Sequence, residues 1–137
     1  MYSLYDYLGS EMLDDFWYDD AILFCEDILK SFYDKDWEEL YNIIPKQSNL
    51  WKKRLVECLG DINSEMALLC IFILSKDNDK DIFIACIDAI KDKNIPIEYK
   101  DEIKFIVMKV KKIRKKCSVF EKIILDDFIK KMINFSC

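Results

Sequence analysis

The sequence has no histidine, and only two glycines and two prolines among its 137 residues. Without histidine, no imidazole can serve as a general base or as a metal ligand near neutral pH. Two isolated glycines cannot build a glycine-rich phosphate loop. The shortage of glycine and proline also leaves few residues suited to tight hairpin turns. These absences argue against a β fold and favour helices joined by short polar links.

Long apolar segments are missing as well. The longest apolar run covers residues 66–74, which is too short to cross a bilayer. The first thirty residues are rich in aspartate and lack the basic start and apolar middle of a secretory signal. We therefore expect a cytoplasmic protein with no part in a membrane.

The length and the hydrophobic content predict one folded unit. Hydrophobic residues make up 52% of the chain and aromatic residues 14%, which is enough material for a single core. The six cysteines, at positions 25, 58, 70, 86, 117 and 137, show no CxxC spacing and mostly lie in apolar runs. Buried, reduced thiols are expected there, with no disulfide framework and no zinc. The prediction is a single all-α domain over residues 1–137 without cofactors.

Hydrophobic spacing predicts about seven helices. The first covers residues 11–33, where an apolar stripe recurs at steps of three and four: Leu13, Trp17, Ala21, Phe24, Ile28 and Phe32. Six more helices are expected within residues 36–44, 48–60, 64–75, 82–90, 96–117 and 118–132. Gly60 is expected to end the helix within residues 48–60 in a left-handed turn.

A weak internal repeat bears on the architecture. Residues 55–63 align with residues 86–94 at an offset of 31, pairing Leu59 with Ile90 and Asp61 with Asp92. Stacked helix pairs produce such echoes because each pair buries the same face against the next. Two architectures remain open from this pattern, a HEAT-like helical stack and an irregular helical bundle.

No group of residues in the sequence gives a strong indication of a catalytic or metal site. Asp77, Asp79 and Asp81 imitate the start of a calcium-binding loop, but the later ligand positions do not fit, and a helix cap is the better interpretation. Adjacent carboxylates, such as Asp14 with Asp15, diverge around a helix instead of converging on a substrate. We expect neither a metal site nor an enzyme.

Charge is distributed unevenly along the chain. Residues 1–50 contain twelve acidic residues and three lysines, a net charge of −9, whereas residues 101–137 contain ten basic and five acidic residues, a net charge of +5. The overall net charge of −5 argues against general nucleic-acid binding. A weaker alternative is local binding by the basic tract, which consists of Lys109, Lys111, Lys112, Arg114, Lys115 and Lys116.

The acidic, aromatic N-terminal region is the candidate binding surface. Six of the seven tyrosines precede residue 42, and tyrosine beside carboxylate is typical of protein recognition surfaces. A helix over residues 11–33 would place most of the candidates on one outward stripe. The predicted partner-binding residues are Glu11, Asp15, Tyr18, Asp19, Glu26 and Tyr33. Either this face binds a basic protein partner, or it is a solvated face over an aromatic core.

Two segments carry a resemblance to a known family. WKKRLVECLGD at residues 51–61 and SKDNDKDIFIACIDAI at residues 75–90 resemble the helical immunity proteins of bacterial contact-dependent growth inhibition and related polymorphic toxin systems. The resemblance implies a cytosolic protein that binds the C-terminal domain of a cognate toxin and covers its active site. Such toxins are often nucleases with basic clefts. The alternative is an intracellular adaptor of viral Bcl-2-like type, whose apolar groove receives a partner helix.

Overall fold

The computed structural model describes residues 3–133, and within them it contains helices and no strands. The helices are α1 (Leu4–Gly9), α2 (Asp14–Phe16), α3 (Ile22–Lys30), α4 (Asp34–Ile43), α5 (Asn49–Leu59), α6 (Glu65–Leu74), α7 (Lys80–Ile90), α8 (Lys100–Ile113) and α9 (Val119–Met132). A π-helical turn, η1 (Trp17–Ala21), joins α2 and α3 into one continuous helix. The all-α prediction is confirmed, all seven predicted helices are present, and α1 is an additional short helix.

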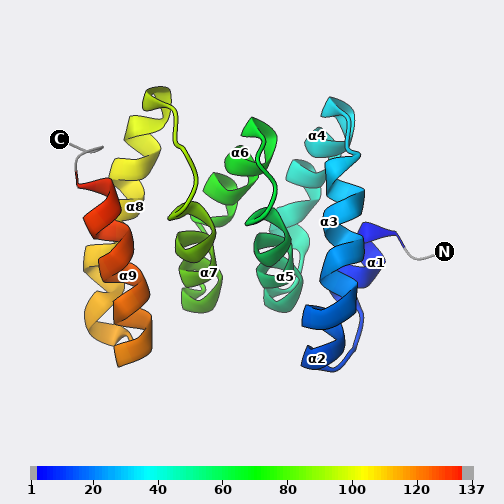
Figure 1. The fold of residues 1–137 in the computed structure, drawn as a ribbon, viewed down its shortest axis with the longest axis horizontal. Coiled ribbons are helices and arrows are strands. Elements are labelled where there is room, and N and C mark those ends of the chain that lie inside the picture. Colours follow the sequence, from blue (N-terminus) through cyan, green and yellow to red (C-terminus); the bar gives the residue numbers. More distant parts are fainter. Residues whose placement is uncertain (1–2, 134–137) are drawn as a thin grey trace.

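The helices form two rows. α3, α5, α7 and α9 lie side by side in the first row, each in contact with the next, and α4, α6 and α8 form the second row (Figure 1). α1 packs against α3 and α5 at the N-terminal end. Of the two architectures left open by the sequence, the structure has the stack of helix pairs.

The predicted repeat corresponds to two neighbouring helices of the first row. α5 and α7 are both eleven residues long, and their N-caps, Ser48 and Asp79, are 31 positions apart. Each cap side chain accepts a hydrogen bond from the backbone three residues later. Leu59 and Ile90, paired in the repeat, are both fully buried. The sequence repeat therefore corresponds to two equivalent helices in contact. The hydrogen bond from the Ile82 amide confirms Asp79 as a helix cap.

One hydrophobic core runs through both rows. α6 is buried on most sides, as its nearly continuous apolar sequence predicts. Five of the six cysteines are free and buried, also as predicted, while Cys137 lies outside the described residues. Among residues 3–133, none of the helices combines the length and the hydrophobicity that crossing a bilayer requires.

The first long helix differs from its prediction. It begins at Asp14 and ends at Lys30, so residues 11–13 and 31–33 lie outside it. The π-helical turn inserts extra chain into the helical register, and the fully buried positions of this helix follow a spacing of four: Trp17, Ala21, Cys25 and Leu29. The predicted apolar stripe is wrong at Leu13 and Phe24, which are 81% and 53% exposed.

A second correction concerns Gly60. Its φ is −57°, a right-handed helical value, so the left-handed turn expected there is wrong. The chain leaves α5 through a tight turn in which the Ile62 amide donates to the Leu59 carbonyl at 3.1 Å. Gly60 lies beside Ala89 of α7, where an added Cβ would make an ordinary van der Waals contact at 3.8 Å, so the packing does not require glycine there.

Buried polar contacts from α5 hold α1 in place. Nη1 of Arg54 donates to the carbonyls of Leu8 at 3.2 Å and Ser10 at 2.7 Å. The Arg54 guanidinium also lies 5.1 Å from the centre of the Trp17 ring. Nε1 of Trp51 donates to the Tyr5 carbonyl at 3.3 Å. Arg54 and Trp51 belong to the segment that carries the family resemblance, and in this chain their side chains serve the packing of α1.

Candidate binding groove

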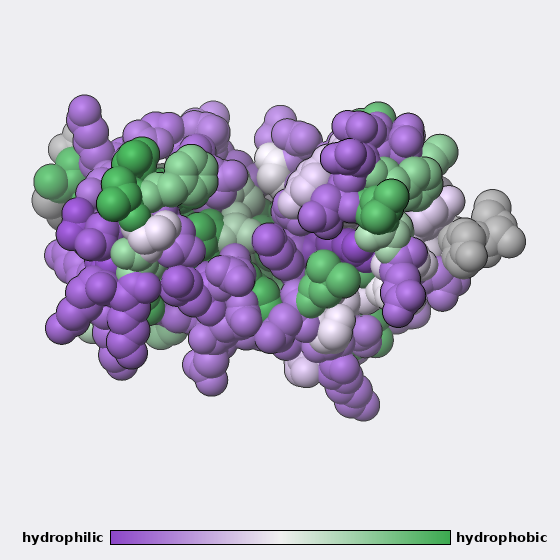
Figure 2. Space-filling model, turned by 90° about the horizontal axis from the view of Figure 1, so that it is seen from below, coloured by the Kyte–Doolittle hydropathy of each residue, from purple (hydrophilic) through white to green (hydrophobic). Residues whose placement is uncertain are grey.

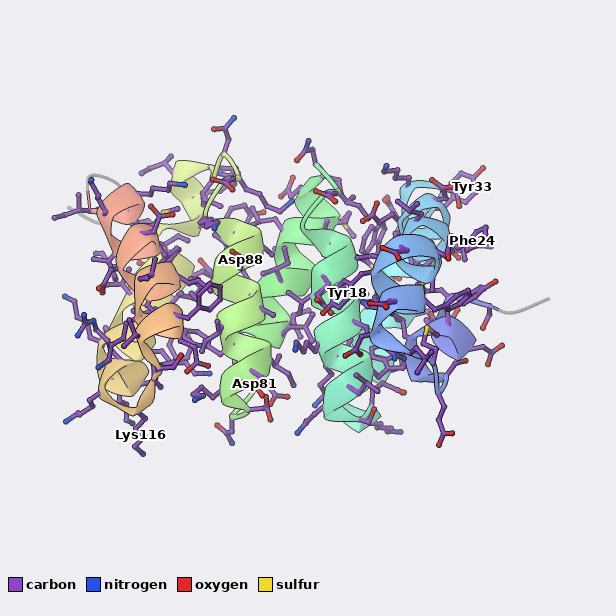
Figure 3. The ribbon with its side chains drawn as sticks, turned by 60° about the horizontal axis from the view of Figure 1, so that its bottom comes forward. Tyr18, Phe24, Tyr33, Asp81, Asp88 and Lys116 are labelled. Carbon is purple, nitrogen blue, oxygen red and sulfur yellow. The ribbon has the colours of Figure 1, made fainter. Side chains whose placement is uncertain are left out.

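A groove with a volume of about 700 Å³ crosses the exposed side of the first row. Its lining comes from η1, α5, α7 and α9, together with the ends of α5 and α7. Figure 3 shows this side, with Asp81 and Asp88 along α7, between Tyr18 on one side and α9 on the other. We call it the acidic groove. Its lining residues are Tyr18, Lys53, Val56, Glu57, Gly60, Asp61, Asp81, Ile84, Ala85, Asp88, Ala89, Lys91, Asp92, Phe120, Glu121 and Ile124.

Small and apolar residues create the hollow. Val56 and Ile84 are buried, and they form part of the apolar base of the groove. Gly60, Ala85 and Ala89 contribute little or no side chain where α5 and α7 meet. Because the α7 side chains that face the groove here, Ala85 and Ala89, are short, space remains between α5 and α9.

Acidic residues dominate the polar lining. Six carboxylates face two lysines there, the six being Glu57, Asp61, Asp81, Asp88, Asp92 and Glu121. Ion pairs at the surface, two of them with one half-buried partner, join Asp88 to Lys91 at 2.8 Å, Asp92 to Lys131 at 2.7 Å and Glu121 to Lys80 at 3.1 Å. Such surface pairs contribute little to stability and can exchange partners. Asp81 forms no ion pair with any described residue, and even with Lys80 and Lys131 counted, six carboxylates face four lysines, so the groove has an excess of negative charge.

Aromatic side chains stand on both sides of the groove. The Tyr18 hydroxyl donates to Oε2 of Glu57 at 2.7 Å, which ties η1 to α5. Partial burial and this acceptor carboxylate raise the pKa of Tyr18 to about 12, so the hydroxyl stays protonated as a donor. On the opposite side, Phe120 is 72% exposed. The groove thus offers one oriented phenol and one free phenyl ring.

Of the six predicted partner-binding residues, only Tyr18 lines the acidic groove. Asp15 and Asp19 are exposed on the same helix. Glu11 lies in the link between α1 and α2, and Tyr33 lies just before α4. The predicted single stripe is therefore wrong, because the helix is shorter than expected and contains the π-helical turn.

Glu26, the remaining predicted residue, faces inward and is only 7% exposed. Burial raises the pKa of Glu26, and the neighbouring Asp61 carboxyl, with which it shares a hydrogen bond, raises it further. Since Asp61 lines the groove, Glu26 supports the groove from behind. The outward orientation expected for Glu26 is wrong.

The Glu26 environment predicts a pH-dependent stability. A carboxyl whose pKa is raised by folding stabilises fully below its unfolded pKa, and this contribution is lost as pH rises through the folded pKa. Glu26→Gln, which cannot ionise, should therefore raise the melting temperature at pH 7 by about 2–4 °C and leave it nearly unchanged at pH 4. Thermal unfolding followed by circular dichroism at both pH values measures this. The exposed Glu38→Gln is the matched control, and an equal effect of the two substitutions would contradict the inward carboxyl pair.

Several groove residues could not be found from the sequence. Phe120 lies at helical spacing from Phe128 and Met132, which favours a common buried face; those two are buried, but Phe120 is not. Phe120 instead lines the acidic groove, on the exposed side of the first row. The one available signal was the seven-residue spacing of Asp81 and Asp88, which places both on one face of a helix.

The basic tract is partly used inside the fold. Nζ of Lys109 donates to the carbonyls of Ser75 at 2.8 Å and Asp77 at 2.6 Å, and it lies 4.5 Å from the centre of the Phe83 ring. Arg114 forms a two-pronged ion pair with Asp126 at 2.8 and 2.9 Å. Lys109 is therefore a cap for the end of α6 and does not belong to a solvated basic face.

The described residues contain no group of histidine, cysteine, aspartate and glutamate side chains that could hold a metal ion. Comparison with protein-family models, with curated proteins and with solved structures finds no match. The chain is a small all-helical protein whose most distinctive surface feature is the acidic groove.

Proposed function

We propose that this protein is an immunity protein, which binds a cognate toxin domain and covers its active site without catalysing a reaction. The observation that carries the proposal is the acidic groove, in which six carboxylates and two lysines surround an apolar hollow. A partner that fits such a surface is a basic protein. A nuclease toxin is the proposed class, because its substrate cleft must attract phosphate.

The proposed mechanism is competition for that cleft. Carboxylates such as Asp81 and Asp88 would occupy the positions of nucleic-acid phosphates, and the body of the stack would block access. Opposite charge on the two proteins would speed their encounter at low salt. This mechanism needs no cofactor and no ordered loop. It also places the protein in the cytoplasm, where an incoming nuclease would reach its substrate.

The alternative of an adaptor with a helix-binding groove has weaker support. An adaptor of Bcl-2-like type would present an apolar groove, and the sequence left this open. The groove here has an apolar base, but carboxylates make up most of its polar lining. Recognition by charge is therefore the stronger interpretation.

Charge reversal in the groove tests the proposal. The toxin candidate is the product of the reading frame next to this gene, co-purified with the protein. Asp81→Lys with Asp88→Lys should weaken binding about 100-fold, because each reversal replaces an attraction with a repulsion, and should reduce the salt dependence of association. Titration calorimetry and stopped-flow association at several salt concentrations measure both effects.

Two control pairs locate the surface. Glu38→Lys with Asp101→Lys changes charge by the same amount on the second row, and Asp101 matches Asp81 in its position within the first turn of a helix. This pair should leave affinity within about threefold of the unmodified protein. Asp15→Lys with Asp19→Lys tests the N-terminal helix face separately. If only that last pair weakened binding, the groove would be the wrong surface; if the adjacent gene product did not bind at all, the immunity role would fail.

A further inference from the structure

Exposed hydrophobic residues on α9 adjoin the acidic groove. Val119, Phe120 and Ile123 are 77%, 72% and 61% exposed, at the start of a helix whose other side is buried. Figure 2, which views the molecule from below, shows hydrophobic residues gathered at the α9 side, and others at the N-terminal side, of a largely hydrophilic surface. Large side chains grouped in this way on a protein surface mark interaction sites. We call these three residues the α9 ridge.

The α9 ridge and the groove are continuous through Phe120. Phe120 and Ile124, one helical turn apart, both line the groove, while Val119 and Ile123 lie on the adjoining strip of the same helix. An occupant of the groove would therefore meet carboxylates on α7 and an apolar wall on α9 at once. A ligand with only positive charge would leave that wall uncovered.

The spacing along α7 matches a helix. Asp81 and Asp88 are seven residues apart, which corresponds to roughly 10 Å along the helix axis. Ile84 and Ala85 lie between them, and all four residues line the groove. A second helix laid along α7 would repeat this pattern in complementary form, with basic residues seven positions apart and apolar residues three and four positions after the first.

We infer that the groove receives one amphipathic, basic helix of the partner protein, with Phe120 as its hydrophobic anchor. The inference rests on the proposed function, since it specifies the part of the basic partner that is bound. Carboxylates of α7 select the positive face of that helix, and Phe120 with Ile124 covers its apolar face. Residues that dominate the affinity of an interface are desolvated by the partner and ringed by contacts that exclude water, and a helix against this wall would desolvate Phe120 in that way.

A designed peptide provides the test. The probe is a fluorescein-labelled peptide of about 18 residues, or five helical turns, with lysines seven positions apart and leucines three and four positions after the first lysine. A scrambled peptide of the same composition has the same charge without the helical pattern. In fluorescence anisotropy, the patterned peptide should bind about tenfold more tightly than the scrambled one. Equal affinities would overturn the helix inference.

The anchor is tested with matched substitutions. Phe120→Ala should weaken binding of the patterned peptide about 30-fold. Met108→Ala removes a side chain of equal exposure, 71%, from α8 outside the groove lining, and should change affinity less than about twofold. Circular dichroism melting of both variants checks that neither loses its fold. Equal effects of the two substitutions would overturn the role of Phe120.

Two further outcomes separate this inference from the proposed function. If Asp81→Lys with Asp88→Lys weakens toxin binding but Phe120→Ala does not, the acidic groove keeps its function and the helix anchor is wrong. Sedimentation of the unmodified protein tests a second copy as the occupant. A dimer that Phe120→Ala dissociates would assign the α9 ridge to self-association and overturn the inference.

Discussion

Replacing Arg54 by alanine is expected to lower the free energy of unfolding by about 2–4 kcal/mol. The Arg54 side chain is 4% exposed and donates to the carbonyls of Leu8 and Ser10. Its loss would leave both acceptors without this donor and would open a cavity beside Trp17, whose Nε1 has no hydrogen-bond partner among the described residues. Urea denaturation measures the loss.

The location of the damage is also predicted. In a stack, each unit contacts mainly its neighbours, so Arg54→Ala should speed amide hydrogen exchange in α1 before it does so in α7. Arg54→Met, which keeps most of the side-chain volume, should recover part of the lost stability, whereas Arg54→Lys cannot reproduce the planar contact with Trp17. Uniformly faster exchange over the whole chain would contradict a local anchor.

Phe83→Ala is expected to cost about 3–5 kcal/mol, because it removes a fully buried ring from the centre of α7. Phe83 is 1% exposed, and α7 contacts α5, α6 and α9, so this loss should affect the whole stack. Denaturant unfolding should show a lower midpoint, and hydrogen exchange should increase in several helices at once.

Two variants control the Phe83 experiment. Phe83→Leu keeps a buried hydrophobic side chain and should cost about 1–2 kcal/mol, whereas Phe105→Ala, at a position 47% exposed, should cost less than about 1 kcal/mol. Lys109 adds a specific readout. Burial lowers its pKa, so opening the space beside it should return that pKa toward its ordinary value in Phe83→Ala. An unchanged Lys109 titration would show that the cavity had collapsed.

Helix content was predictable because its causes are local. The scarcity of glycine and the apolar spacing of residues 48–60, 64–75 and 96–117 determine α5, α6 and α8 with little help from the rest of the chain. The N-caps of α5 and α9, Ser48 and Ser118, are the first residues of the predicted ranges 48–60 and 118–132. The contact between α5 and α7 was also indicated by the sequence, through the internal repeat at an offset of 31 residues.

The register of the first long helix was not predictable from spacing. A π-helical turn is stabilised by tertiary contacts of its residues, and here Trp17 and Ala21, at its two ends, are both buried. Its extra chain shifts which side chains face the core, and it leaves Phe24 beside Tyr7 at the surface. Glu11 and Tyr33 lie outside the expected stripe because the helix is shorter than predicted, and Glu26 because it faces the core.

The sequence by itself determined the helices, the buried thiols and the excess of acidic residues in the N-terminal third. The tertiary structure determined which acidic residues gather at one surface. All six groove carboxylates come from residues 57–121, outside the segment whose net charge is most negative. Net charge along a chain counts residues, whereas potential at a surface depends on which side chains face the same space. The packing of α5, α7 and α9 brings these carboxylates to one groove, and residue spacing within a single helix does not specify that packing.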